Sequence, residues 1–195
     1  IVYSLKYMPI SELPNLLALN KNYNKTLQKI IYKNILLKYR DMDIKTHLYI
    51  WKLIMNYNEH KKTYNYKEIK EKIKKMENNN KKNKYLEIID LDVNRTFFEK
   101  DKELNRTKIS YILKSISNEC PNINYSQGMN FIAAFLLNIS EDEEEAFYLF
   151  VSLLKTSDYG KLFTNYLANL KKFFYVFERL LNILLPELFN YLKVN

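Results

Sequence analysis

Residues 125–137 read Tyr-Ser-Gln-Gly-Met-Asn-Phe-Ile-Ala-Ala-Phe-Leu-Leu, so a short polar stretch turns directly into a long apolar run. The chain has only two glycines in 195 residues, and one of them, Gly128, stands at this junction. Glycine loses more backbone entropy on folding than any other residue, so a chain so poor in glycine needs a local reason to place one. Two interpretations are open. Gln127 and Gly128 either begin a helix that packs closely on another helix, or they form a site.

The pattern of apolar residues predicts an all-α fold without a sheet. Apolar positions recur at helical spacing over 26–37, 44–57, 66–76 and 102–117, and the apolar run 129–137 is typical of a central buried helix. The low-complexity stretch 77–84 is expected to be a surface loop.

Later helix ends carry their own signals. Ser140 and Glu143 form a capping-box pattern that predicts the next helix start. Gly160 fits the end of that helix. Thr164 can cap a further helix, whose expected inner face includes Phe174 and Phe177.

Composition excludes several classes of function. No apolar run reaches the ~18 residues of a membrane span, and the single cysteine, Cys120, favours a reducing, cytosolic setting. His47 and His60 are thirteen residues apart, the lone cysteine is far from both in sequence, and no ligand cluster has zinc-like spacing, so we expect no metal. The net charge of +9 could attract anionic membrane, nucleic acid or an acidic protein, but arginine, which base readers favour, is scarce beside lysine.

A second motif lies about thirty residues before the first one. Ile89, Asp92 and Arg95 follow one another at intervals of three residues. In a helix that runs into a loop, Asp92 could accept hydrogen bonds from Arg95 and fix its direction. An ordinary surface ion pair worth well under ~1 kcal/mol is the alternative that spacing alone leaves open.

Taken together, the two motifs resemble the paired signature of TBC domains, the all-helical GTPase-activating domains that act on Rab-type small GTPases. The flanking residues agree with this resemblance: Arg95-Thr96-Phe97, the apolar helix after Gln127-Gly128, and Leu185-Pro186-Glu187-Leu188 all look like family motifs. The resemblance runs from about residue 38 to the end. It implies an irregular orthogonal array of helices over 38–195. For residues 1–37, which precede the match, we expect a helical extension.

The resemblance also implies roles for individual residues. Arg95 would be an arginine finger and Gln127 a glutamine finger, both inserted into the active site of a Rab-family GTPase. Asp92 would aim Arg95, and Gly128 would let the partner's backbone come close. Supporting roles fall to Tyr125 and Asn130. The chain would need no cofactor of its own, because GTP and Mg²⁺ arrive on the partner, and it would have no independent catalytic activity.

Two departures from the family pattern stand out. Trp51 is present, but His47 stands where the family has an arginine that supports the site, and Asp41-Met42-Asp43 replaces Gly-Ile-Pro. We assign Trp51 and His47 structural roles. The match also stops where the family continues with more helices, so we expect the chain to be the amino-terminal two-thirds of the domain.

Two other functions remain open at the level of sequence. Loss of the arginine at position 47 favours a pseudo-GAP that holds a GTPase without accelerating it. The basic charge favours, more distantly, a helical adaptor for anionic membrane or RNA, although we expect no nucleic-acid partner. In each case we expect a cytoplasmic protein, with peripheral association on endomembranes left open.

Overall fold

The computed structural model describes residues 43–78, 84–96, 102–123, 125–156, 158–163 and 168–194. In this part of the chain every regular element is a helix and no strand occurs, which confirms the all-α prediction. The elements are α4 (Ile44–Ile54), α5 (Tyr57–Thr63), α6 (Tyr66–Asn78), α7 (Lys84–Asn94), α8 (Lys102–Glu119), α9 (Met129–Ser140), α10 (Glu143–Thr156), the 3-10 helix η3 (Asp158–Phe163), α11 (Ala168–Leu184) and α12 (Pro186–Val194). The predicted extension over 1–37, Phe97 and Thr164 lie outside the described residues.

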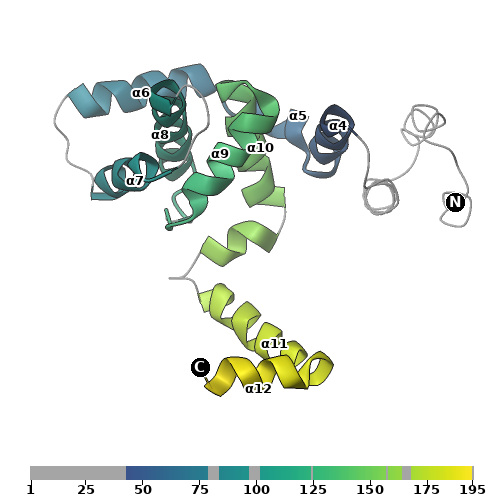
Figure 1. Cartoon of the computed structure of the whole chain (residues 1–195). Coiled ribbons are helices and arrows are strands. Elements are labelled where there is room, and N and C mark those ends of the chain that lie inside the picture. Colours follow the sequence, from purple (N-terminus) through teal and green to yellow (C-terminus); the bar gives the residue numbers. More distant parts are fainter. Residues whose placement is uncertain are drawn as a thin grey trace, which may run out of the picture.

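Helix α10 lies at the centre of the fold (Figure 1), where it contacts α5, α6, α8, α9 and η3. Every residue from 146 to 152 is buried, and Phe147 and Phe150 are completely inaccessible to solvent. Burial of one such phenylalanine side chain contributes about 1.5–3 kcal/mol. The aromatic residues of α10 therefore form the centre of the core around which the other helices are arranged.

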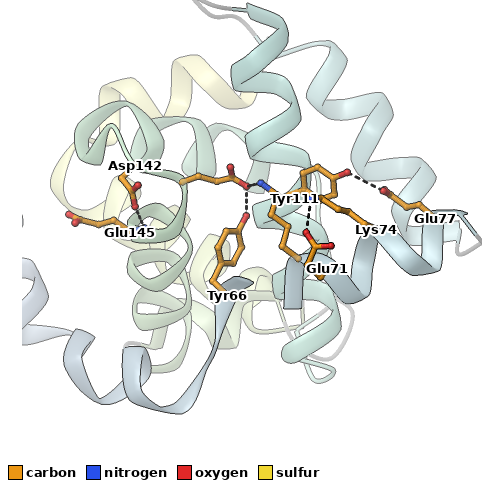
Figure 2. Close-up of polar contacts among 9 residues, drawn as sticks. Tyr66, Glu71, Lys74, Glu77, Tyr111, Asp142 and Glu145 are labelled. Carbon is orange, nitrogen blue, oxygen red and sulfur yellow. Dashed lines mark hydrogen bonds and ion pairs between the residues drawn. The ribbon is translucent and has the colours of Figure 1, made fainter. Parts of the chain in front are cut away.

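Tyrosines connect α10 to the beginning of α6. The Tyr66 ring stacks on Phe147 with the ring centroids 4.7 Å apart. The Tyr66 hydroxyl donates to Glu143 Oε1 (2.5 Å), and Figure 2 draws this bond as the dashed line that starts at Tyr66. The Tyr148 hydroxyl donates to the Tyr64 carbonyl oxygen (2.9 Å) and accepts from the Tyr66 backbone N–H (3.3 Å). Burial raises the pKa of Tyr66, and the bond to Glu143 adds to that effect. The hydroxyl therefore stays a hydrogen-bond donor.

A buried lysine holds α6, α7 and α8 together. Lys114 of α8 is 5% exposed, and its Nζ lies 2.6 Å from Glu77 Oε1 and 2.7 Å from Asp90 Oδ2. Ser110 donates to the other oxygen of Asp90 at 2.7 Å. Burial alone would lower the pKa of Lys114, but the bonds to Asp90 and Glu77 outweigh it and the pKa is raised. The two ion pairs of Lys114 therefore fix α7 against α6 and α8.

Two helix ends differ from the sequence prediction. The helix predicted over 44–57 is broken at Asn56, which adopts the left-handed conformation (φ 54°) that asparagine tolerates. Ser140 does not cap α10, because it ends α9 and its hydroxyl donates back to the Leu136 carbonyl at 2.8 Å. Asp142 takes the capping role instead, since its Oδ1 accepts from the Glu145 backbone N–H at 2.7 Å.

Two helices are more exposed than their apolar sequences predicted. Helix α9 was expected to be buried on all sides, yet Phe131 is 56% exposed and Phe135 50%. In α11, Phe174 and Phe177 were expected to face inward, yet both are 63% exposed. Figure 1 shows the reason for α11: with α12 it forms a hairpin that extends away from the other described helices and meets them through η3.

Close packing explains the glycine at position 160. It lies in η3 rather than at the end of α10, where the sequence placed it. A Cβ at this position would lie 1.9 Å from the carbonyl oxygen of Leu154. Only glycine therefore lets η3 fold back against the last turns of α10.

Gly160→Ala should lower the free energy of unfolding by about 3 kcal/mol, because the clashing Leu154 oxygen belongs to the backbone of α10. Gly128→Ala is the matched control. No atom lies within 4 Å of its Cβ position, so only the positive φ costs energy, about 1–2 kcal/mol. Urea unfolding followed by far-UV circular dichroism measures both variants. Equal losses would contradict the close approach of η3 to α10.

Candidate functional site

Arg95 lies in the turn that follows α7. The inner face of that helix is fixed by Ile89, which is completely buried, and by Val93, which is 2% exposed. The Arg95 backbone N–H donates to the Asp92 carbonyl oxygen (3.1 Å) and closes the turn. The Arg95 side chain is exposed, and none of the ion pairs between described residues involves it. A fixed backbone therefore presents an exposed guanidinium.

Gln127 lies in the matching turn before α9. Gly128 has a φ of 102°, a conformation that L residues with a side chain rarely adopt. Its backbone N–H donates to Asn130 Oδ1 (3.1 Å), and the Met129 N–H donates to the Ser126 carbonyl oxygen (3.1 Å). The Gln127 side chain is exposed. This turn thus holds the side-chain amide of Gln127 outside the core, and Gly128 allows the backbone conformation of the turn.

Four buried residues connect these two turns by hydrogen bonds. The Tyr125 hydroxyl donates to Asp92 Oδ2 at 2.8 Å. Asn130 Nδ2 donates to Thr96 Oγ1 at 2.8 Å and makes a longer contact with the Asp92 carbonyl oxygen at 3.4 Å. Thr96 Oγ1 donates to that same carbonyl oxygen at 3.0 Å. All four residues are at most 9% exposed. We call this set, Asp92, Thr96, Tyr125 and Asn130, the buried network.

In each of the two turns, residues of the buried network flank the exposed side chain in sequence. Asp92 and Thr96 stand on either side of Arg95 in the chain, and Tyr125 and Asn130 stand on either side of Gln127. The flanking residues of one turn are hydrogen-bonded to those of the other. These bonds fix the positions of the two turns relative to each other. The two motifs that the sequence analysis paired thus meet in the structure, with Arg95 and Gln127 both exposed.

Asp92 contacts a different partner from the one expected. The sequence predicted a side-chain bond from Arg95 to the Asp92 carboxylate, but that carboxylate is buried and accepts from Tyr125. Asp92 contacts Arg95 through the main chain only. Burial raises the pKa of Tyr125, and the bond to Asp92 raises it further. The tyrosine therefore remains protonated and able to donate.

The surface above Gly128 is open. No atom of the described residues lies within 4 Å of the position that a Cβ would occupy there. The expected role of this glycine, admitting the backbone of a partner, is compatible with that space. A close approach of another helix, the alternative from the sequence, finds no counterpart at the Cβ position among the described residues.

His47 and Trp51 lie on α4 and take no part in the hydrogen bonds of the buried network. His47 Nδ1 is 3.2 Å from the Asp43 carbonyl oxygen in the first turn of the helix. Trp51 is partly buried against the core, and its ring lies 6.3 Å from that of Phe135 on α9. The structural roles that the sequence suggested for these two residues stay a prediction.

The described residues were also searched for a metal site, a reactive cysteine and membrane-spanning helices. They contain no group of three or more His, Cys, Asp and Glu side chains that could hold a metal ion. Cys120 is buried, and burial raises the pKa of its thiol, which makes it a poor nucleophile. None of the helices in the described part has the length and apolar character to cross a membrane.

Sequence reasoning gave Thr96 no role of its own. It stood only as the middle residue of the Arg-Thr-Phe triplet, and its small side chain gave no sign of burial. In the structure it is 2% exposed and joins Asn130 to the Asp92 carbonyl. The sequence signal that could have identified Thr96 is its position directly after Arg95, the candidate arginine finger.

Comparisons with known proteins point to one domain family. A model of the Rab-GTPase-TBC domain matches residues 45–195. A TBC domain-containing protein of Schizosaccharomyces pombe is 36% identical over 110 residues, which cover 54% of this chain and 14% of that protein. The GTPase-activating protein GYP5 of Saccharomyces cerevisiae is 36% identical over 99 residues, 51% of this chain and 11% of that protein. The chain thus spans a small part of the length of these relatives.

A solved structure shares the fold. The crystal structure of a Chlamydomonas flagellar RabGAP TBC domain superposes with a TM-score of 0.65 at 17% identity, covering 98% of this chain and 63% of that one. At this identity the likeness concerns the fold alone. Since the family model matches more than half of the residues, this chain belongs to the Rab-GTPase-TBC domain family.

Proposed function

We propose that this chain is a GTPase-activating module that inserts Arg95 and Gln127 into the active site of a Rab-type small GTPase. The observation that carries the proposal is the buried network, which joins the turns of two exposed side chains with complementary chemistry. Membership of the Rab-GTPase-TBC family supports a GTPase as the partner.

The chemistry needs these two residue types. In GTP hydrolysis, negative charge develops on the transferred phosphoryl group, and a water must be held in line for attack. Arg95 would neutralise the developing charge, because a planar guanidinium can bond two phosphate oxygens at once. Gln127 would orient the water, since its amide can donate and accept. GTP and Mg²⁺ are supplied by the partner.

Pre-organisation is the second part of the proposed mechanism. Catalytic groups lose efficiency when they are misplaced by even 1 Å. The buried network fixes both backbones before the partner arrives, so only the two side chains need to be ordered on binding. Asp92, Tyr125, Thr96 and Asn130 act here as positioning residues, and Gly128 leaves room for the partner's backbone.

A non-catalytic Rab-binding module is the second candidate. Two observations favour it: His47 replaces the arginine of the family pattern, and the Asp92 carboxylate contacts Tyr125 rather than Arg95. Such a pseudo-GAP would bind the GTP form of the GTPase without accelerating hydrolysis. Phosphate release measured against a panel of GTPases, alongside binding, separates the two candidates. Binding that falls steeply with salt and survives the loss of both Arg95 and Gln127 would instead indicate a basic adaptor for membrane or RNA.

Arg95→Ala in the full-length protein should reduce stimulated GTP hydrolysis by about 10³-fold or more. Arg95→Lys keeps the positive charge but loses the planar, two-pronged group, so it should recover only a small part. The side chain is exposed, so the melting temperature of both variants should equal that of the wild type. Full stimulated activity in Arg95→Ala would exclude Arg95 as the finger.

Gln127→Ala should reduce stimulated hydrolysis by about 10²-fold, as loss of a water-positioning or charge-stabilising group does. The sharper test uses a GTPase whose own catalytic glutamine is replaced by leucine. If Gln127 orients the water, the wild-type chain accelerates that GTPase and Gln127→Ala does not. If the wild-type chain requires the GTPase's own glutamine, Gln127 is not the second finger.

Thr96→Val tests the buried network without touching either finger. It removes the hydroxyl that accepts from Asn130, which should lower the free energy of unfolding by about 1–3 kcal/mol. We expect the stimulated kcat to fall roughly tenfold as the Arg95 turn loosens. Thr96→Ser keeps the hydroxyl and should restore both quantities. A kcat that stays at the wild-type value in Thr96→Val would separate the network from catalysis.

A further inference from the structure

A cleft lies between α6, α7 and α8. Its volume is about 580 Å³, which is within the range of sites that bind small molecules. All three helices contribute polar or charged side chains to its lining, among them Glu77, Asp90, Glu103, Arg106, Tyr111 and Lys114. We call it the α8 cleft. None of these six residues belongs to the buried network or is a candidate finger, so the proposed mechanism gives the α8 cleft no role.

One set of charged residues in the α8 cleft is already paired. Lys114 Nζ lies 2.6 Å from Glu77 Oε1 and 2.7 Å from Asp90 Oδ2. Ser110 donates to the other oxygen of Asp90 (2.7 Å). The Tyr111 hydroxyl makes a longer contact with Glu77 Oε2 (3.4 Å), which Figure 2 draws as a dashed line. One positive and two negative charges thus neutralise one another in part, and the set keeps a single net negative charge.

Two other charged side chains of the α8 cleft are not paired. None of the ion pairs between described residues involves Glu103 or Arg106. The two residues are three apart in α8 and therefore lie on the same side of that helix. The α8 cleft thus contains one positive and one negative group whose charges no described residue balances.

The guanidinium of Arg106 is the stronger sign of a missing ligand. Its Nε atom is closed off from solvent and has no hydrogen-bond partner among the described residues. Buried N–H groups are nearly always paired, because an unpaired one costs free energy. Arg106 as a whole is only partly buried and lines the α8 cleft. A small rotation of its side chain would let a carboxylate bond Nε and a terminal nitrogen together, the two-pronged arrangement that a guanidinium favours.

We propose that the α8 cleft binds a small zwitterionic molecule of the amino-acid type, with its carboxylate on Arg106 and its ammonium group on Glu103. The two unpaired charges of the cleft are opposite in sign, as are the two charges of an amino acid. A simple anion fits less well, because the carboxylates of Glu77, Asp90 and Glu103 outnumber the two cationic groups and would repel it. This inference does not depend on the proposed function.

The first test follows the Nε–H resonance of Arg106 in the full-length protein labelled with ¹⁵N-arginine. Arg106→Lys identifies the resonance by removing it. The probes are the twenty standard amino acids at about 10 mM, and we expect at least one to shift the resonance with a Kd of about 1 mM, as is usual for so small a ligand. Two analogues of the best binder, one without the amino group and one without the carboxylate, should bind at least about tenfold more weakly.

The second test measures affinity in variants from the rise of the melting temperature with ligand concentration. Arg106→Lys keeps the positive charge but loses the two-pronged group, so the best-binding amino acid should bind about tenfold more weakly. Glu103→Gln should weaken the amino acid by about tenfold as well, but not the analogue without an amino group, which Glu103 repels. Arg179→Lys on α11 and Glu87→Gln on α7 are the matched controls. They make the same replacements at exposed positions outside the α8 cleft and should leave the affinity unchanged.

Three outcomes would overturn the inference. No amino acid may shift the Arg106 resonance, or the resonances of exposed arginines such as Arg95 may shift as much as that of Arg106, which would indicate a general effect of the solution. The analogue without an amino group may bind as tightly as the amino acid, and the site would then be one for simple anions. Because these readouts use neither Arg95 chemistry nor Gln127, the proposed function stands or fails separately.

Discussion

The hydrogen bonds between the end of α7 and the start of α9 are the constraint on which the candidate site depends. Tyr125 and Asn130 reach across more than thirty residues of sequence to Asp92 and Thr96. Each buried polar group in this set would cost about 1–3 kcal/mol if it lost its partner, so the four residues hold one another in place. The two exposed side chains need no bond between themselves, because their backbones are already related through the buried network.

The rest of the fold keeps α7 and α9 where this network can form. Phe147 and Phe150 of α10 supply the apolar centre, and α9 packs against that helix. Lys114 holds α7 from the other side through Asp90. This ion pair is only partly buried and adds little stability relative to an apolar contact of the same size, but leaving the buried Lys114 without its partners would be costly. Its contribution here is therefore to the position of α7 more than to stability.

The sequence predicted the positions of the helices along the chain better than it predicted which of their side chains are exposed and which partners they contact. Periodicity indicates where a helix lies, which is why the expected helix over 102–117 differs from α8 by only two residues at one end. Periodicity gives no direction when a helix is apolar on all sides, so the exposure of Phe131 and Phe135 was missed. The partner of the Asp92 carboxylate was also missed, because it comes from Tyr125, which is adjacent only after folding. The cap of α10 was assigned to Ser140 for a similar reason. Both Ser140 and Asp142 are residue types that cap helices, and only the folded backbone shows that Asp142 is the one that does so.

The arrangement of fixed backbones and free side chains has an energetic consequence for binding. An arginine side chain loses up to about 2 kcal/mol of conformational entropy when it is ordered, and a glutamine side chain loses a similar amount. No described residue forms an ion pair with Arg95, so in the proposed mechanism the cost of ordering its side chain falls on the encounter with the GTPase.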